Sequence, residues 1–464
     1  MSLRTIAAVA LCKSLHLAAR VLRRGGTAMP GRWALKLCPD LAGTLARGVE
    51  ILVITGTNGK TTSARIAEQA FANAGLDYLA NRSGANLLSG ITTEFCRHAS
   101  LTGRCKKKYA VIECDEAAAR RALGYLQPKA VLVTNLFRDQ LDRYGEVTHT
   151  LENIREGLTK AAPGAVLCLN ADCSLTSSLA LDLPNRVVYY GLDAAAADPT
   201  AKPAALSDAT HCIRCKTEYQ YDYVTYGHLG GFRCPNCGYT RPGADVAITA
   251  IDAMEADSSA IKLSVGGETR AVRVNLPAMY NIYNAAGAVA AVMEMGLSAD
   301  QAVAAVESFH CGFGRMEKFD LGAQGTRVML VKNPAGCDQV LRFLSALSGE
   351  IELAALLNDN DADGTDVSWI WDAEFEVLSS ASAALGDRLR RVYVSGTRAW
   401  DLFLRLKYAG VDPARIVVER DYAALTEQLA AAEVPVFVMP TYTALLEFRP
   451  HLLRRCGGAD FWEG

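Results

Sequence analysis

The segment ITGTNGKTT, from Ile54 to Thr62, constrains the fold of this chain more than any other. It follows the apolar run Ile51–Thr55 and leads into a helical pattern over Lys60–Ala74. In a strand–loop–helix of this kind, glycines let backbone N–H groups turn toward phosphate oxygens, and the helix N-terminus adds the positive end of its dipole. We therefore predict a nucleoside-triphosphate site. Its residues are Gly56, Thr57, Asn58, Gly59, Lys60, Thr61 and Thr62, with the Lys60 ammonium facing the phosphates and the Thr61 hydroxyl on Mg²⁺.

The rest of the chain alternates predicted strands with helices, which is typical of parallel sheets covered by helices on both faces. The further strands are expected at 109–113, 130–134, 166–170 and 187–190, and a helix at 283–295. A second α/β block begins near residue 320, with strands at 329–331, 353–357, 392–395, 416–418 and 436–438. At 464 residues the chain is too long for one core. We predict a helical segment over 1–48, a central ATP-binding domain over 49–318 and a smaller C-terminal α/β domain over 319–464.

Four of the 14 cysteines form a metal-binding pattern. Two residues separate Cys212 from Cys215 and Cys234 from Cys237, and 18 residues lie between the pairs. Four thiolates complete a tetrahedral zinc site and close it, so we predict a structural Zn²⁺ in a ribbon inserted at about 205–245. The alternative is a ribbon that binds nucleic acid, but the surrounding TEYQYDYVTYGHLGGF contains no Lys or Arg.

Charge and hydropathy limit where the chain can act. Lys and Arg number 48 against 50 Asp and Glu, so no basic excess favours nucleic acid. Lys13 and His16 interrupt the only stretch that resembles a secretion signal, and no apolar run approaches 18 residues. We expect a cytoplasmic protein. Residues 5–23 are predicted to form a basic amphipathic helix, which either packs on its own domain or contacts an anionic membrane surface.

The GTNGKTT loop, with two residues between its glycines, resembles that of the Mur ligases and folylpolyglutamate synthases. These enzymes activate a carboxylate as an acyl phosphate and then form an amide. Further segments resemble the family in the same order: AVIECDE with Glu113, TNLFRDQLD over 134–142, MYNIYNAAGA with Asn281 and Asn284, and GRME over 314–317. The resemblance implies that Glu113 binds Mg²⁺, Asn281 contacts adenine and Arg315 contacts phosphate. Gln140 replaces the usual histidine of the family, so no role is carried over to that position.

A Mur ligase central domain interrupted by a four-cysteine ribbon resembles, more narrowly, the MurT family of synthetase subunits of lipid II isoglutaminyl synthase. The segments that carry this resemblance are 19–40, 81–86, 332–336, 357–360, 363–372 and 440–444. The resemblance implies ATP-dependent amidation of the D-glutamate α-carboxylate of lipid II to D-isoglutamine in peptidoglycan synthesis. It also implies a heterodimer with a GatD-like glutaminase that contacts the C-terminal domain and supplies ammonia. Lipid II is membrane-anchored, which would bring the chain to the inner face of the membrane.

The same resemblance implies that Asp366, in ADGTDVSWIWD, completes the partner's catalytic triad by orienting its histidine. The residues alone favour a role for Asp366 as the cap of a helix or turn, and Trp369 and Trp371 beside it could belong to the core or to an interface. Two other functions remain open at this point. One is a stand-alone amino-acid ligase similar to folylpolyglutamate synthase, and the other is a zinc-ribbon ATPase that binds nucleic acid.

Overall fold

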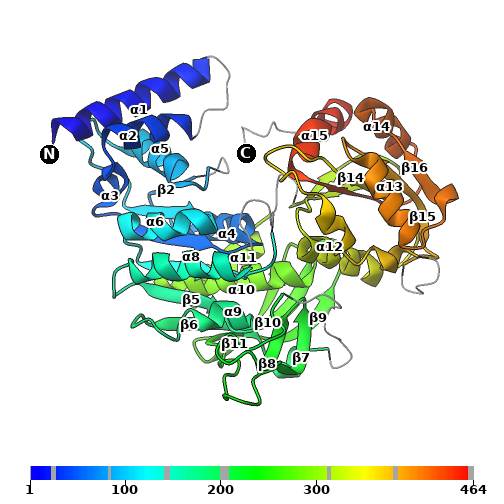
Figure 1. Cartoon of the computed structure of the whole chain (residues 1–464), viewed down its shortest axis with the longest axis horizontal. Coiled ribbons are helices and arrows are strands. Elements are labelled where there is room, and N and C mark those ends of the chain that lie inside the picture. The colour runs from blue at the N-terminus through cyan, green and yellow to red at the C-terminus, as the bar shows by residue number, and fades with distance from the viewer. Residues whose placement is uncertain are drawn as a thin grey trace.

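The computed structural model describes residues 2–21, 28–81, 85–139, 147–198, 208–310, 315–379 and 385–457. Two sheets organise the chain, one of nine strands and one of six, and a separate two-stranded hairpin projects beside the larger sheet (Figure 1). Gln140 and Gly314 lie outside the described residues, as do residues 82–84, and Arg315 is described only in its backbone.

The nine-stranded sheet forms the central domain. Its strands, in spatial order, are β11 (Glu268–Val274), β10 (Ser259–Val265), β9 (Val246–Met254), β6 (Val187–Leu192), β5 (Val166–Asn170), β4 (Ala130–Val133), β1 (Glu50–Thr55), β3 (Tyr109–Glu113) and β2 (Tyr78–Ala80). From β9 to β2 every neighbouring pair is parallel, as the alternation of strand and helix predicted. The strands beginning at residues 109 and 166 have the predicted limits, and β1, β4 and β6 differ from them by one or two residues.

The antiparallel edge of this sheet was not predicted. Strands β9, β10 and β11 form a meander where renewed alternation with helices was expected. The sequence feature that indicates this meander is the pair Gly266-Gly267, which lies between two strands whose residues alternate in burial. Both glycines have positive φ, as a two-residue hairpin turn requires.

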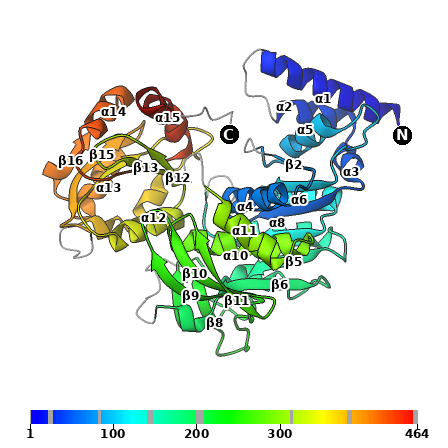
Figure 2. The same ribbon diagram turned by 180° about the vertical axis from the view of Figure 1, so that it is seen from behind.

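Helices cover both faces of the central sheet and extend its core at the N-terminus. They are α1 (Leu3–Val21), α2 (Met29–Leu37), α3 (Leu41–Ala46), α4 (Lys60–Asn73), α5 (Leu88–His98), α6 (Glu116–Leu126), α8 (Val147–Thr159), α9 (Ser174–Ser178), the 3₁₀ turn η1 (Ala194–Ala196), α10 (Met279–Glu294) and α11 (Ala299–Ser308). Figure 1 shows α6 and α8 in front of the sheet, and Figure 2 shows α10 and α11 in front of its other face. Helices α1 to α3 share buried residues with the central core, among them Val9, Cys12 and Leu41.

Side chains mark where several of these helices begin. Asp115 accepts hydrogen bonds from the second and third N–H groups of α6, and Ser298 forms a capping box with Gln301 at the start of α11. Such caps satisfy donors that have no partner within the helix. No helix in the described ranges is long and apolar enough to cross a membrane.

The six-stranded sheet forms the C-terminal domain. Its strands, in spatial order, are β12 (Arg315–Phe319), β13 (Thr326–Met329), β17 (Val436–Pro440), β14 (Ile351–Leu356), β15 (Leu389–Ser395) and β16 (Ile416–Val418). All pairs are parallel except β12 with β13. The strand expected at 329–331 lies at Thr326–Met329 instead, because its pairing with β17 ends at Val328.

The helical elements of this domain are α12 (Pro334–Ala346), η2 (Ser368–Trp371), η3 (Phe375–Leu378), α13 (Ala399–Tyr408), η4 (Pro413–Arg415), α14 (Tyr422–Ala430) and α15 (Tyr442–Cys456). They enclose two hydrophobic clusters, one on each face of the sheet. The predicted α/β architecture with a second α/β domain is therefore confirmed, whereas the domain limits at 48/49 and 318/319 remain predictions.

Candidate nucleotide and metal sites

The phosphate loop links the end of β1 to the start of α4. Gly56 and Gly59 both have positive φ, of 117° and 85°. A Cβ at Gly56 would lie 2.4 Å from the Thr134 hydroxyl, and one at Gly59 would lie 1.9 Å from the side-chain oxygen of Asn284. Only glycine satisfies both the backbone angle and the close approach at these positions.

The Lys60 ammonium lies inside this loop rather than in front of it. It donates to the carbonyl oxygens of Gly56 and Thr57, the latter at 3.2 Å, and pairs with the Glu116 carboxylate at 3.1 Å. Burial alone would lower the pKa of Lys60, but the carboxylates of Glu116, Asp115 and neighbouring residues outweigh burial and raise it. The lysine is therefore charged, and its role as a phosphate ligand remains a prediction. Glu116 was not singled out in the sequence, although it closes the ECDE segment after β3.

The segment after β4 holds the phosphate loop from the side. Asn135 accepts from the Asn58 N–H at 2.9 Å and donates from its amide to the Asn58 carbonyl at 3.0 Å. Thr57 donates its hydroxyl to the Phe137 carbonyl at 3.3 Å and accepts from the Phe137 N–H at 3.1 Å. These hydrogen bonds occupy the side chains of Thr57 and Asn135. They leave the backbone N–H groups of the loop residues after Asn58 to face a ligand.

Helix α10 brings Asn284 of its MYNIYN segment against the loop, and Asn281 lies beside it. Asn284 touches Gly59, and its backbone carbonyl accepts from Ser63 at 3.3 Å. Asn281 donates to the Pro277 carbonyl at 2.7 Å and accepts from the Asn284 amide at 3.3 Å. Both side chains are buried, so α10 is fixed against the start of α4.

Thr61 and Glu113 lie at the same edge of the sheet. Glu113 is the last residue of β3 and pairs with Ile54 of β1, directly before the loop. Both residues are half-buried, and their hydroxyl and carboxylate oxygens are of the kind that Mg²⁺ prefers. The chemistry and the location of these two residues therefore fit a magnesium ion.

The C-terminal domain reaches the phosphate loop through residues 332–336. The Asn333 amide donates to the Asn58 side chain at 3.1 Å, and its oxygen caps α12 by accepting from Gly336. Lys332 pairs with Asp139, next to the segment that holds the loop. The C-terminal domain therefore contacts the phosphate loop directly.

The four predicted zinc ligands lie together. The sulfur atoms of Cys212, Cys215, Cys234 and Cys237 are all within 4.8 Å of one another, and two of the pairs are 3.5 and 3.4 Å apart. Zn–S bonds of about 2.3 Å place sulfurs about 3.8 Å apart in a tetrahedron, so the donor set and its spacing fit a closed zinc site. The two-stranded sheet of β7 (Gln220–Tyr226) and β8 (Leu229–Arg233) joins the two cysteine pairs.

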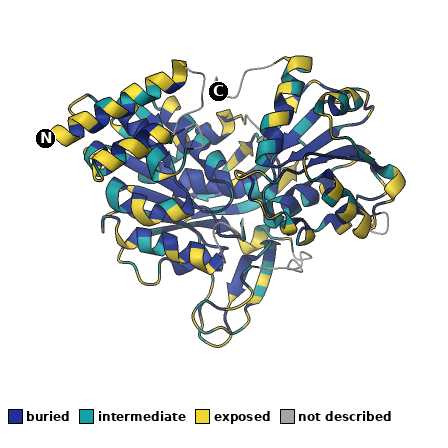
Figure 3. Cartoon of the chain, turned by 45° about the horizontal axis from the view of Figure 1, so that its top comes forward, coloured by how far each residue is buried: buried dark blue, intermediate teal, exposed yellow. Residues whose placement is uncertain are grey.

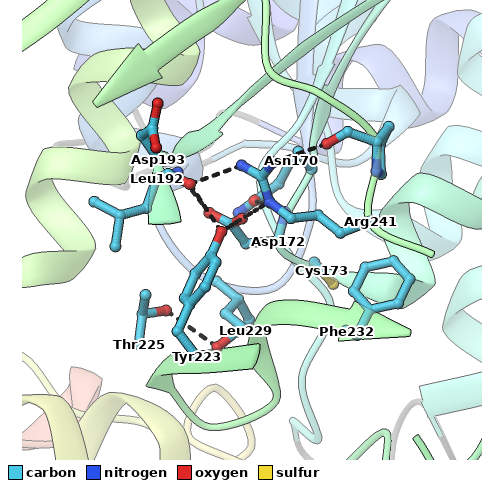
Figure 4. A network of polar contacts seen from close by, with 12 residues as sticks. Asn170, Asp172, Cys173, Leu192, Asp193, Tyr223, Thr225, Leu229, Phe232 and Arg241 are labelled. Carbon is cyan, nitrogen blue, oxygen red and sulfur yellow. Dashed lines mark hydrogen bonds and ion pairs between the residues drawn. The ribbon is translucent and has the colours of Figure 1, made fainter. Parts of the chain in front are cut away.

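A buried carboxylate fastens this ribbon to the central domain (Figure 4). Asp172 is fully buried and accepts from the Arg241 guanidinium at 2.5 Å, the Tyr223 hydroxyl at 3.0 Å and the Leu192 N–H at 2.7 Å. It also accepts from the hydroxyl of Tyr283 at 2.6 Å. Because Tyr283 lies between Asn281 and Asn284 on α10, one carboxylate joins the ribbon to the helix that packs on the phosphate loop.

The tip of the ribbon hairpin reaches the segment after β4 that holds the phosphate loop. The Phe137 ring stacks on Tyr226, with 5.8 Å between ring centroids, and meets the His228 ring at a tilt, with 4.7 Å between centroids. A Cβ at Gly227, where φ is 56°, would lie 2.6 Å from this ring. Phe137 is the residue whose backbone holds Thr57, so the ribbon supports the loop through one aromatic side chain.

Asp366 lies on the surface of the C-terminal domain, in the loop before η2. Its carboxylate accepts from the Ser368 N–H at 2.8 Å, and the hydrogen bonds with Ser368 lower its pKa. Ile370 is buried, Trp369 packs partly on the core, and Trp371 is 48 % exposed. An exposed stripe formed by Trp400, Leu404 and Tyr408 lies on α13, and Tyr408 contacts Trp371 edge to face.

Comparisons with known proteins agree with this architecture. Residues 54–292 match the Mur ligase middle domain, and residues 330–445 match the family described as MurT ligase C-terminal. The chain is similar to the lipid II isoglutaminyl synthase (glutamine-hydrolyzing) subunit MurT of Streptococcus pneumoniae, with 32 % identity over 98 % of both chains. It is 34 % identical to the subunit of that name from Staphylococcus aureus, over 99 % of this chain and 100 % of the relative.

More distant solved structures share the fold. A pseudomurein peptide ligase type C from Methanothermus fervidus has a TM-score of 0.66 at 17 % identity, covering 88 % of this chain and 79 % of the other. Folylpolyglutamate synthase from Mycobacterium tuberculosis has a TM-score of 0.62 at 14 % identity, covering 98 % of this chain and 99 % of that structure.

Proposed function

The chain belongs to the MurT family of Mur ligase-type enzymes, and from this membership we propose that it amidates the D-glutamate α-carboxylate of lipid II. The product is D-isoglutamine within the stem peptide, and the reaction belongs to peptidoglycan synthesis. The observation that carries the proposal is the full-length similarity to two MurT subunits, together with a phosphate loop and a four-cysteine ribbon on one Mur ligase fold.

The chemistry requires activation of an unreactive carboxylate. Transfer of the γ-phosphoryl group of ATP to the carboxylate oxygen gives an acyl phosphate and ADP. Ammonia then attacks the carbonyl carbon, phosphate leaves, and the ammonium proton passes to solvent. Positioning of the reactants and neutralisation of charge on the phosphoryl group account for most of the catalysis in transfers of this type.

The residues around the loop suit these roles. The N–H groups of the loop and of the first turn of α4 would bind phosphate oxygens, and Lys60 would exchange its contacts with loop carbonyls for phosphate. Thr61 and Glu113 would hold Mg²⁺, which adds positive charge beside the phosphates when bound. Asn281 would contact adenine and Arg315 a phosphate, as the family resemblance implies.

We propose that ammonia comes from a GatD-like glutaminase bound to the C-terminal domain in a heterodimer. The exposed Asp366, its low pKa and the neighbouring aromatic surface of Trp371, Trp400 and Tyr408 support this arrangement. An ionised carboxylate is what an orienting residue of a triad requires, and aromatic residues are enriched at protein interfaces. Since lipid II is membrane-anchored, the complex would work at the inner face of the membrane.

The experiment is a comparison of two nitrogen sources with one variant. The purified heterodimer is given lipid II, ATP and Mg²⁺ with either glutamine or concentrated ammonium, and the product is identified by mass spectrometry. Loss of the orienting carboxylate costs hydrolase triads on the order of 10⁴-fold, so Asp366→Asn should fail with glutamine and work with ammonium. Asp361→Asn, an exposed residue in the same loop, serves as the control.

Two results would contradict parts of the proposal. If a folded, partner-bound Asp366→Asn complex fails with both nitrogen sources, Asp366 does not act through the glutaminase. If the native chain alone couples a free amino acid to its substrate and needs no glutaminase, it is a stand-alone ligase similar to folylpolyglutamate synthase.

A further inference from the structure

The outward face of α1 is apolar where a surface helix usually presents polar residues. The side chains of Leu3, Leu17 and Val21 are 85, 63 and 75 % exposed, and Ile6 is also exposed. At 3.6 residues per turn, positions 3, 6, 10, 14, 17 and 21 lie along one side of the helix, and the exposed Ser14 is the one polar residue among them. A helix on a globular domain normally turns such a stripe toward the core.

The opposite side of the same helix already packs on the core. Thr5, Ala8, Val9, Cys12 and Ala19 are buried, and α1 packs through them on α2 and α5. The exposed stripe is therefore additional to the packing stripe. Figure 3 shows α1 at the rim of the molecule, with exposed residues along its outward side.

Basic side chains border the apolar stripe. Arg4 and Arg20 are exposed beside it, and the Lys13 ammonium reaches the Ala99 carbonyl at 2.5 Å. On the neighbouring helix α2, Trp33 is half exposed and the Lys36 ammonium lies 4.4 Å from the centre of its ring. The described residues 2–21 and 28–39 include no Asp or Glu, and none of their basic side chains forms an ion pair within the described chain.

We propose that the outward face of α1 docks on the surface of an anionic phospholipid bilayer. An apolar stripe flanked by Lys and Arg is the pattern of helices that lie in the membrane interface, with apolar side chains among the acyl chains and basic ones at the headgroups. Trp33 is of the residue type enriched at that depth. The 19-residue helix is about 28 Å long and would lie flat.

Charge favours lipid over a second copy of the chain. In a symmetric dimer built on this face, Arg4 and Arg20 of one copy would approach the basic residues of the other. An anionic bilayer instead supplies the opposite charge to every basic side chain along the helix.

The inference rests on the proposed function in one respect, that a lipid-anchored substrate requires the chain to work at a bilayer. Vesicle binding is measured with neither nucleotide nor lipid II present. A failure of vesicle binding therefore leaves the proposed amidation intact, and a failure of amidation leaves vesicle binding intact.

The test is cosedimentation of the full chain with vesicles of phosphatidylglycerol and phosphatidylcholine in equal amounts, compared with phosphatidylcholine alone. The native chain should bind the anionic vesicles and bind the neutral ones far more weakly. The triple variant Leu3→Ser/Leu17→Ser/Val21→Ser should bind about 100-fold more weakly, since three apolar side chains no longer enter the lipid. The double variant Arg4→Gln/Arg20→Gln, which keeps the stripe, should bind about 30-fold more weakly.

The matched control is Leu181→Ser/Met254→Ser, which removes two exposed apolar side chains of the central domain, one after α9 and one at the end of β9, and should bind like the native chain. Circular dichroism verifies that each variant is folded. The proposal is overturned if the native chain ignores anionic vesicles, binds both compositions equally, or loses no binding in a folded triple variant. It is also overturned if light scattering shows a dimer that the triple substitution dissociates while vesicle binding is absent.

Discussion

Replacing Asp172 with alanine tests whether the ribbon is held to the central domain by a buried charge. The substitution removes the acceptor of four hydrogen bonds and leaves the Arg241 guanidinium, whose side chain is 16 % exposed, without its carboxylate. Breaking a buried ion pair by removing one partner costs about 3–5 kcal/mol. We therefore expect the free energy of opening the ribbon to fall by about 4 kcal/mol, from the loss of the charged partner alone.

Hydrogen exchange measures this opening directly. The Gly230 N–H donates to the Asp172 backbone carbonyl at 2.9 Å, across the contact between the ribbon and the central domain. Since 1.36 kcal/mol corresponds to tenfold, a loss of about 4 kcal/mol predicts exchange about 10³-fold faster in the segment 219–233. Peptides from β1 and β4, which lie away from this contact, should change much less.

The control is Asp222→Ala, which removes a carboxylate from the same hairpin. Asp222 is exposed and pairs with Arg233 at 3.3 Å, and exposed pairs contribute about 0–1 kcal/mol. Exchange in the ribbon should therefore change less than about tenfold. If Asp172→Ala accelerates exchange no more than Asp222→Ala does, the buried carboxylate does not anchor the ribbon.

Three further predictions address the other sites. Lys60→Ala should abolish ATP-dependent amidation, and it should also lower the urea midpoint because it leaves Glu116 buried without its cationic partner. The double variant Lys60→Ala/Glu116→Gln should regain the midpoint but not the activity. Cys215→Ser should release Zn²⁺ and lower stability, whereas metal analysis that finds no zinc in an active native sample would contradict the ribbon assignment. Burial raises the pKa of the Asp338 carboxyl group to about 7, so the folded chain binds the proton of this group more tightly than the unfolded chain does. The stability that this difference contributes is therefore lost as the pH rises from about 4 through 7. Asp338→Asn should therefore gain stability relative to the native chain at pH 8 and not at pH 4, and an equal urea midpoint difference at both values would refute this.

The parts of the fold that were predicted depend on patterns that are local in the sequence. Strand β3 and strand β5 are short apolar runs buried on both faces, and such runs can be identified without knowing their neighbours. The phosphate loop and the cysteine pairs are likewise recognisable from residue type and spacing alone. Among the antiparallel strands after residue 245, β9 is partly exposed along most of its length and lacks a regular alternation, whereas β10 alternates clearly and was missed although the sequence carried its signal.

The partners of the site residues could not be predicted, because they depend on how distant segments meet. Lys60 and Glu116 are 56 residues apart, and Asp172 and Tyr283 are 111 apart. The sequence identifies Lys60 by its motif, but nothing local to Glu116 distinguishes it from the adjacent Asp115, which caps α6 instead. A carboxylate acquires its role only when tertiary packing buries it beside a particular cation.

The ribbon and the phosphate loop are far apart in the sequence but are connected in the structure by two sets of contacts. Phe137 is fixed on one side by Tyr226 and His228 of the hairpin, and on the other side its backbone exchanges two hydrogen bonds with Thr57. Asp172 makes a second connection, since it binds the ribbon through Arg241 and helix α10 through Tyr283. A metal held by these four cysteines would have no open coordination position and therefore no chemical part in the reaction, but by stabilising the hairpin it would stabilise the surface on which Phe137 rests. Ring contacts of Phe137 and the hydrogen bonds of Asp172 therefore connect the ribbon to the phosphate loop, which gives a structural site inserted into this domain a route by which it can affect the loop.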